Sequence, residues 1–253
     1  MEFQFKDIKK KGHLHHKSFE KFMIAAIILA GVLIIFNQIQ LSAISSSFDS
    51  LTGTASKQSI LFGFGSKKSD LSKVDVSDVS STAMAVALLF PELKSMNNEQ
   101  DAMAIMIPTG TPEYSSALGG ISFDDPVTSM EYLAKWYPAI NSEIKNNNPE
   151  IWQRYLKLAA APRGISCEFC CGVGPQGITA DGAPKCGCQH LPALLGLTLG
   201  LIKNTDYSDA QILKEVMRWK TLFFPQNMVG LAMEVAGKDP SQLKELPGMV
   251  GGC

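Results

Sequence analysis

Fifteen consecutive residues without a polar side chain, at positions 22–36 (FMIAAIILAGVLIIF), constrain this chain more than any other feature. Folded as a helix, they would cover ~22 Å, which is shorter than the ~30 Å hydrocarbon core of a bilayer. Apolar residues at 19, 39, 41 and 44 lengthen the apolar face, and Lys21 can extend its ammonium group to the lipid headgroups. The sequence therefore predicts a transmembrane helix over residues 22–44, with the lipid bilayer as its partner.

Charge around this run predicts its orientation. Six lysines precede the run, and no charged residue follows it until Asp49. Because positively charged flanks stay in the cytoplasm, residues 1–21 should form a cytoplasmic basic tail, and the C-terminal part of the chain should be extracytoplasmic. A cleaved signal peptide is the competing interpretation, since Ala43 and Ser45 could stand before a cleavage site. We favour localisation as a single-pass protein of the cell membrane.

Residues 45–81 are predicted to be a Ser-rich linker. Thirteen of the forty residues at 42–81 are serine and the apolar ones are scattered, so the segment cannot bury enough surface to offset the cost of ordering. The whole chain carries 24 acidic and 23 basic residues, for a net charge of -1. Without a basic excess to hold a phosphate backbone, we expect no nucleic-acid partner.

Residues 82–253 show mostly helical periodicity, which predicts a mainly α fold with one small helical domain. Helix-start signals are the pairs Thr128 and Glu131, Asn148 and Pro149, and Ser208 and Gln211. Further helices are predicted over residues 82–89, 99–106, 191–203 and 226–236, and short strands over 105–108 and 120–123. Gly196 and Gly200 lie four residues apart in an apolar segment, which predicts a close approach to another helix.

Five of the six cysteines lie within the 22 residues 167–188, in a segment rich in glycine. The pattern is Cys-x-x-Cys-Cys followed by Cys-x-Cys-x-His, and its members are Cys167, Cys170, Cys171, Cys186, Cys188 and His190. Two cysteines separated by two residues on a turn can bind one ion, as in zinc knuckles and iron–sulfur loops. The one-residue spacing of the second pair favours a thiolate-rich copper or zinc site over a standard zinc ribbon. We interpret all six residues as metal ligands, with Cys171 or His190 as replacement or additional ligands.

Two other interpretations of the cluster remain open. An extracytoplasmic domain is usually oxidised, so the six cysteines could form three disulfides, with Cys253 reaching the cluster or a second chain through Gly251 and Gly252. The chain would then be a disulfide-stapled structural or self-assembling surface protein. Thiol oxidoreductase chemistry is the third interpretation, because Cys167 and Cys170 have the spacing of an exchange motif.

Two neighbouring residues bear on the charge of the cluster. Cys188 stands just before a predicted helix, whose positive end would favour a thiolate or a metal-bound sulfur. Arg163 either offsets the charge of the thiolates or is a solvated loop residue.

The cysteine pattern, together with the segment Trp219-Lys220-Thr221-Leu222-Phe223-Phe224-Pro225, resembles a group of uncharacterised archaeal membrane-anchored proteins with the same two motifs. The likeness covers residues 105–225. The segment Pro184-Lys185-Cys186-Gly187-Cys188 is more distantly similar to bacterial lipoproteins with a PCYCGC motif, from which it departs at Lys185 and in lacking a lipobox cysteine. The resemblance implies a membrane-tethered, cysteine-rich ectodomain and no particular activity.

Taken together, the residues predict a membrane-anchored extracytoplasmic protein that holds or transfers a soft metal ion, copper or zinc, without bond-breaking catalysis. A second copy of the chain or a metal-exchange protein is the expected protein partner.

Overall fold

The computed structural model describes residues 70–242 and 246–251. The predicted transmembrane helix and most of the predicted linker fall in residues 1–69 and so lie outside the described residues. Within the described ranges, every helix is too short or too polar to cross a bilayer. The chain divides into two units, residues 1–64 and 65–253, and the second contains everything described below.

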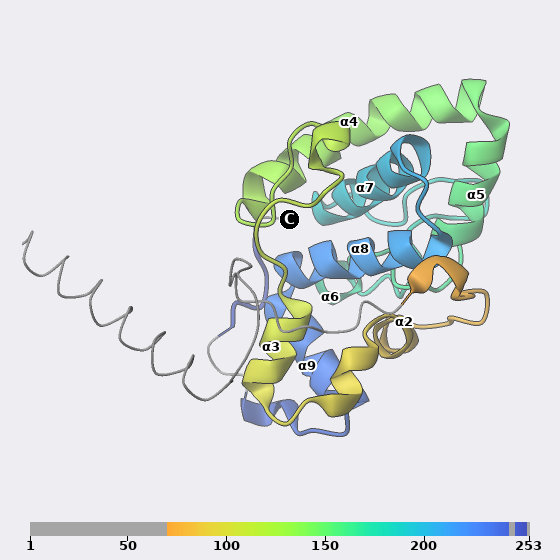
Figure 1. Cartoon of the computed structure of the whole chain (residues 1–253). Coiled ribbons are helices and arrows are strands. Elements are labelled where there is room, and N and C mark those ends of the chain that lie inside the picture. The colour runs from red at the N-terminus through yellow and green to blue at the C-terminus, as the bar shows by residue number, and fades with distance from the viewer. Residues whose placement is uncertain (1–69, 243–245, 252–253) are drawn as a thin grey trace, which may run out of the picture. The chain divides into compact units, whose positions relative to one another are not determined.

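The described unit is built from helices joined by turns (Figure 1). The helices are α2 (Thr82–Leu89), α3 (Glu99–Met106), α4 (Pro126–Asn147), α5 (Pro149–Ala159), α6 (Glu168–Cys171), α7 (His190–Asn204), α8 (Asp209–Phe223) and α9 (Pro225–Val235). Short 3-10 helices cover Leu71–Lys73, Pro91–Ser95, Ser115–Leu118 and Pro240–Gln242. Among the described residues, β pairing is limited to one isolated bridge between Ile178 and Pro184. The mainly α fold class is therefore confirmed.

Two predicted strands are wrong. Residues 105–106 are the last turn of α3, and residues 120–123 form irregular chain ahead of α4. Gly119 and Gly120 adopt φ of 81° and 85°, a left-handed conformation that turns the chain and that no strand contains. The apolar side chains of Ile121 and Phe123 are buried, so burial alone produced the strand-like pattern.

Two of the three start signals are confirmed. Ser208 forms a complete capping box with Gln211, and Asn148 is the N-cap residue that precedes Pro149. The third prediction, a cap at Thr128, is wrong because α4 begins at Pro126. There the Asp125 side chain accepts a hydrogen bond from the Thr128 amide at 3.2 Å. A proline with a preset φ after an acidic cap is the stronger start signal.

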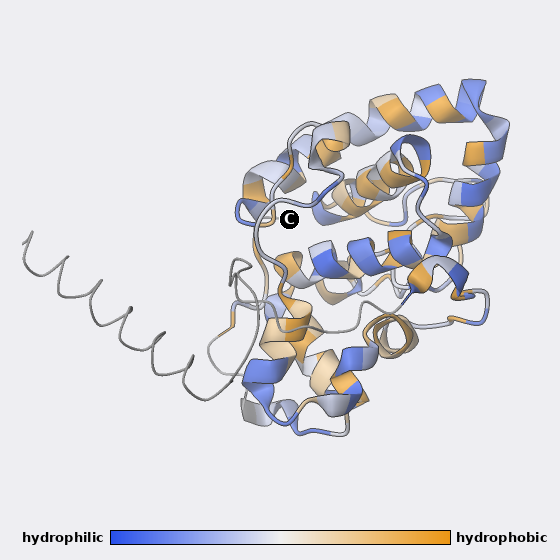
Figure 2. Ribbon diagram, viewed as in Figure 1, coloured by the Kyte–Doolittle hydropathy of each residue, from blue (hydrophilic) through white to orange (hydrophobic). Residues whose placement is uncertain are grey.

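Helix α7 is the centre of the domain, and α4, α5 and α8 pack around it (Figure 1). It is buried along nearly its whole length, whereas α4 alternates apolar and polar residues and exposes one face (Figure 2). The polar residues of α8, such as Lys214 and Glu215, are half-buried. A Cβ atom at Gly196 would lie 2.7 Å from the Leu133 carbonyl oxygen, and one at Gly200 would lie 2.8 Å from the Trp136 ring. The predicted role of this glycine pair in close helix packing is confirmed.

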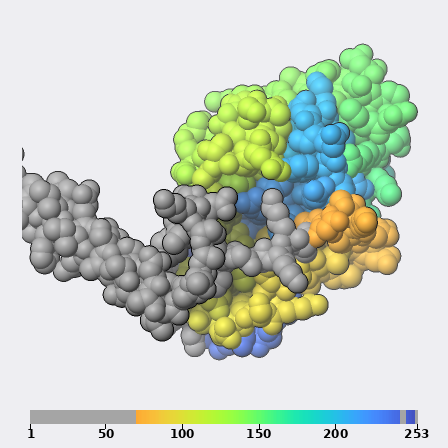
Figure 3. Space-filling view, in the orientation of Figure 1, coloured from red at the N-terminus to blue at the C-terminus, as the bar shows by residue number. Residues whose placement is uncertain are grey.

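The folded unit begins before residue 82, the first position after the end of the linker that the sequence predicts. Leu71, Val76 and Val79 are buried in the core, although their segment has the composition of a linker. The Ser208 hydroxyl donates to the Leu71 carbonyl at 3.0 Å, which holds this segment beside α8 (Figure 3). Sparse apolar residues are therefore enough to fix these residues, because the helices supply the rest of the core.

Candidate metal centre

Two segments bring the cysteines together. Cys167 is the N-cap residue of the one-turn helix α6, and Gly172 ends that helix with a φ of 64°. The chain then returns through a hairpin closed by the Ile178–Pro184 bridge, which places Cys186 and Cys188 immediately before α7. The hairpin is held by Gly177, where a Cβ atom would lie 2.1 Å from the Ile165 carbonyl oxygen. Only glycine permits this approach of the two segments.

The sulfur atoms form one group. The Sγ atoms of Cys167 and Cys188 are 3.1 Å apart, those of Cys167 and Cys171 are 3.9 Å apart, and those of Cys170 and Cys171 are 3.7 Å apart. Cys171 and Cys186 form a disulfide. The Sγ atoms of Cys167, Cys171, Cys186 and Cys188 all lie within 4.8 Å of one another.

The cluster has an inner and an outer pair of cysteines. The inner pair, Cys167 and Cys188, consists of free thiols that are 0% and 9% exposed. The outer pair is the disulfide, in which Cys171 is exposed and Cys186 is half-buried. Solvent therefore reaches the bridged sulfurs and is almost excluded from the thiols.

His190 joins the cluster from the first position of α7 and is fully buried. One of its ring nitrogens lies within 4.8 Å of the Sγ atoms of Cys170 and Cys188. Nε2 lies 2.9 Å from the Val250 carbonyl oxygen, whereas Nδ1 is buried without a hydrogen-bond partner. Because a carbonyl only accepts, Nε2 carries the proton, and the neutral ring has its lone pair on Nδ1. An imidazole that is fixed in this way through its other nitrogen is typical of metal-binding histidines.

The two inner thiols differ in acidity. The hydrogen bond with Cys167 lowers the pKa of Cys188 below the ordinary 9.0, and His190 and the backbone amides at the start of α7 act in the same direction. The same hydrogen bond, together with burial, raises the pKa of Cys167. Cys188 is therefore the more acidic of the two thiols.

An ion pair between Lys220 on α8 and Glu168 on α6 holds α6 in place. The Lys220 side chain is 0% exposed, and its Nζ lies 2.7 Å from Glu168 Oε1 and 3.0 Å from the Gly164 carbonyl oxygen. The Thr82 hydroxyl also donates to Glu168, and the ammonium lies over the Phe169 ring. The positive charge of Lys220 favours ionisation of the nearby Cys167 thiol, and burial lowers the pKa of Lys220 itself. Sequence reasoning missed this lysine, although a lysine inside an apolar helical segment was a visible signal.

Arg163 takes neither of its two predicted roles. It is buried, and its guanidinium donates to backbone carbonyls, with Nε 2.8 Å from the Val76 oxygen. Lys157 and Ser77 supply the other two carbonyl acceptors. Arg163 therefore ties the segment at residues 71–79 to the helices, and Lys220 is the buried cation beside the thiols.

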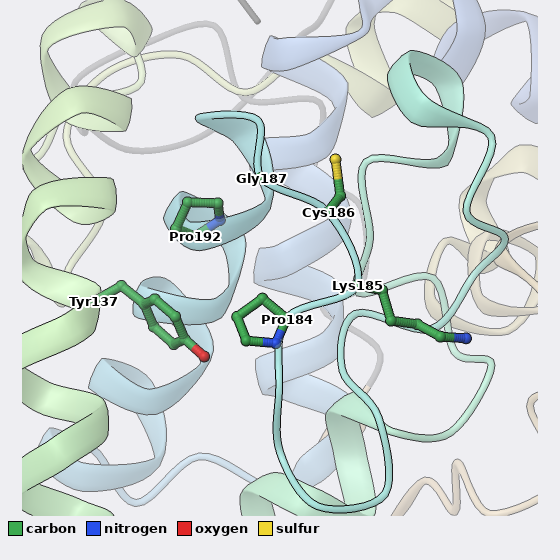
Figure 4. Close-up of a pocket in the computed structure, with 6 residues that line it drawn as sticks. All are labelled: Tyr137, Pro184, Lys185, Cys186, Gly187 and Pro192. Atoms are coloured by element: carbon green, nitrogen blue, oxygen red, sulfur yellow. The ribbon is translucent and has the colours of Figure 1, made fainter.

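A shallow hollow borders the cluster on the α4 side, lined by Tyr137, Pro184, Lys185, Cys186, Gly187 and Pro192. Figure 4 shows Tyr137, Pro184 and Pro192 around this hollow and the Cys186 sulfur directed away from it. Cys186 is the one cysteine among the lining residues, so the hollow does not reach the inner pair.

All six residues predicted as ligands lie in this one cluster. Comparison with protein-family models, with curated proteins and with solved structures gives no match. The chemistry of the site therefore has to be argued from its geometry. Thiols and an imidazole within 4.8 Å of one another can hold a metal ion, and adjacent cysteines can form disulfides.

Proposed function

We propose that this chain is a membrane-anchored extracytoplasmic protein that binds a soft transition-metal ion, copper(I) or zinc, through the 167–190 cluster. Its role is to hold the ion or to hand it to a metal-exchange protein. The anchor is the apolar segment at 22–44, and the proposed ligands are Cys167, Cys170, Cys171, Cys186, Cys188 and His190.

The observation that carries this proposal is the group of four sulfur atoms, those of Cys167, Cys171, Cys186 and Cys188, that lie within 4.8 Å of one another. The Nδ1 atom of His190 supports it as a replacement ligand, because it is buried near Cys170 and Cys188 and makes no hydrogen bond. An unpaired polar atom in the interior costs about 1–3 kcal/mol of stability. Disulfide formation at the neighbouring cysteines would leave this cost in place. A metal ion beside Cys188 would remove it, because the lone pair of Nδ1 would become a ligand.

In the reduced cluster, modest shifts of the sulfur atoms would suit a single four-coordinate ion. A tetrahedral site with metal–sulfur bonds of about 2.3 Å has sulfur atoms about 3.8 Å apart. The 3.9 Å between Cys167 and Cys171 matches this value, and the inner pair at 3.1 Å would have to separate by about 0.7 Å. Thiolate and imidazole ligands favour copper(I) and zinc over magnesium or calcium, which prefer oxygen.

Metal binding by the full chain, purified in detergent under inert gas and reduced with a phosphine, tests the proposal. Competition against a chromophoric chelator should give one Zn²⁺ or copper(I) ion per chain. Cys188→Ser should lower the affinity more than about 100-fold, since even outer-shell changes cost ~10–100-fold. Asp181→Asn, in the exposed turn of the hairpin that carries no cysteine, is the control and should bind like the parent chain. A fully reduced chain that binds neither ion would overturn the proposal.

A disulfide-stapled surface protein is the second candidate, and the Cys171–Cys186 bridge favours it. The bridge joins α6 to the hairpin before α7, so it could serve only to fasten a glycine-rich loop. In that case the reduced chain would lose thermal stability and addition of metal would not restore it. An oxidoreductase is less well supported, because both free thiols are buried away from a protein substrate.

A further inference from the structure

The two cysteines that form the disulfide are the more exposed ones, and the two cysteines that are free thiols are buried. The two sulfurs in the disulfide belong to the exposed Cys171 and the half-buried Cys186. The two buried cysteines, Cys167 and Cys188, are thiols. An external thiol can therefore reach the bridge while the inner thiols stay protected by the core.

The inner pair forms a half-site that does not depend on the bridge. Cys167 precedes α6, which is held in place by the ion pair of Lys220 with Glu168. His190, two residues after Cys188, is held by the Val250 carbonyl and by ring contacts with Phe223 and Phe224. Both inner sulfur atoms are thus positioned by the core whether or not Cys171 and Cys186 are bridged.

Each cysteine of the outer pair borders glycine-rich chain. Cys171 ends α6 and is followed by Gly172 and Gly174, where a Cβ atom would meet no other atom within 4 Å, and the same is true of Gly187 after Cys186. The chain beside both outer sulfurs is therefore loosely packed. Separation of these two sulfurs to the spacing of metal ligands can be taken up by these glycine-containing segments.

From this arrangement we infer that the exposed Cys171–Cys186 bridge is a redox control on metal binding, an inference that rests on the proposed function. With the bridge closed, only Cys167 and Cys188 of the four-sulfur group are available as ligands, because the strong ligand is a thiolate and not a disulfide sulfur. With the bridge open, Cys171 and Cys186 complete a four-sulfur site whose members already lie within 4.8 Å of one another. The two alternatives read from the sequence, metal site and disulfide, are then two states of one cluster.

The reductant is a low-molecular-weight thiol, such as the tripeptide thiol glutathione. Its thiolate attacks one sulfur of the bridge, forming a mixed disulfide and releasing the other cysteine as a thiolate. A second thiol molecule attacks the mixed disulfide and releases the remaining cysteine. Two electrons and two protons pass from two small thiols to the cysteines, and one small disulfide is the product. Oxidation by that small disulfide reverses both steps and expels the ion.

The test is to measure Cd²⁺ affinity as a function of redox state. The full chain in detergent is equilibrated with graded ratios of reduced to oxidised glutathione, and glutathione is then removed by gel filtration under inert gas. Peptide mapping establishes the fraction of chains with Cys171 bridged to Cys186. Titration with Cd²⁺ is followed by the ultraviolet sulfur-to-cadmium absorption. We expect the affinity to fall more than about 100-fold as that fraction rises from none to all, since two of four ligands are lost.

Two variants locate the effect. Cys171→Ser cannot form the bridge and should bind Cd²⁺ with one intermediate affinity at every glutathione ratio. Cys253→Ser keeps both pairs and should retain the full dependence on the ratio. A redox response that persists in Cys171→Ser, or that disappears in Cys253→Ser, would assign control to another cysteine and overturn the inference.

The unmodified chain separates this inference from the proposed function. Equal Cd²⁺ affinity with the bridge open and closed would overturn the redox control and leave metal binding standing. Failure of Cd²⁺ to bind in either state would overturn the proposed function as well.

Discussion

At the scale of single residues, His190 determines what the cluster can do. Its Nε2 is occupied by the Val250 carbonyl, and its Nδ1 is available to a proton or to a metal ion. Burial acts to lower the pKa of His190, but interactions with Cys188 and with the Val250 carbonyl outweigh it and raise the pKa above the ordinary 6.5. Protons and metal therefore compete for one nitrogen.

This competition predicts that the stability of the metal-free fold and the affinity for Zn²⁺ depend on pH in opposite directions. Without metal, the raised pKa stabilises the fold fully below pH 6.5, and that stabilisation is lost as pH rises through the folded-state value. Zn²⁺ affinity should instead increase over the same interval, because the proton must leave Nδ1 before it binds the ion. Denaturant unfolding and chelator competition at a series of pH values measure both. In His190→Gln both dependences should flatten in this interval, and an unchanged profile would contradict the assignment.

At the scale of elements, α6 is a single turn that cannot be stable alone and is fixed by its contacts. The most important contact is the ion pair between Glu168 on α6 and Lys220 on α8, because Lys220 is entirely buried. Removal of one partner from a buried pair leaves an uncompensated charge in the interior. The position of Cys167 and Cys171 therefore depends on a helix that contributes no ligand.

Lys220→Met should lower the free energy of unfolding by about 3–5 kcal/mol, because the half-buried Glu168 carboxylate would lose its partner. Combination with Glu168→Gln should recover part of the loss. Denaturant unfolding measures both variants. Lys135→Met is the control, because the pair Lys135–Glu131 is at 3.8 Å with side chains 80% and 49% exposed. It should cost less than about 1 kcal/mol. An equal effect of the two lysine substitutions would contradict the role given to Lys220.

At the scale of the whole molecule, the proposal requires a helical domain tethered to a membrane by residues 22–44. The cluster is then held on the extracytoplasmic side, where disulfides form and persist. A bridge such as Cys171–Cys186 fits that location. Tethering also restricts the domain to partners at the same membrane, which suits transfer of an ion between proteins.

The full chain should sediment with membranes and resist extraction by high salt. Replacement of Ile28 and Leu33 by arginine should release it to the soluble fraction or prevent insertion, because each arginine at the centre of a spanning helix costs roughly 2.5–3.5 kcal/mol. Fractionation and immunoblotting of cells expressing either form measure this. Replacement of Ser59 and Ser66 in the linker by arginine is the control and should leave the chain in membranes. A parent chain found in the soluble fraction would contradict the anchor.

Local sequence patterns determined the elements and the composition of the cluster. The helices at 82–89 and 99–106 match α2 and α3, because apolar periodicity and caps act within a few residues. The glycine pair in α7 predicted close packing against another helix, since a side chain at either position would collide with α4. The chemical character of the cluster was likewise visible in five crowded cysteines and one histidine.

Tertiary structure alone decided how those groups are used. The pairing of Cys171 with Cys186, the burial of Cys167 with Cys188 and the bond from His190 to Val250 join residues 15, 21 and 60 positions apart. The buried positive charge beside the cluster belongs to Lys220, which pairs with Glu168, 52 residues away in the sequence. Arg163, which the sequence offered for that role, donates to backbone carbonyls. Local patterns carry no information about such pairs, because burial and charge compensation depend on which helices meet when the chain closes on its core.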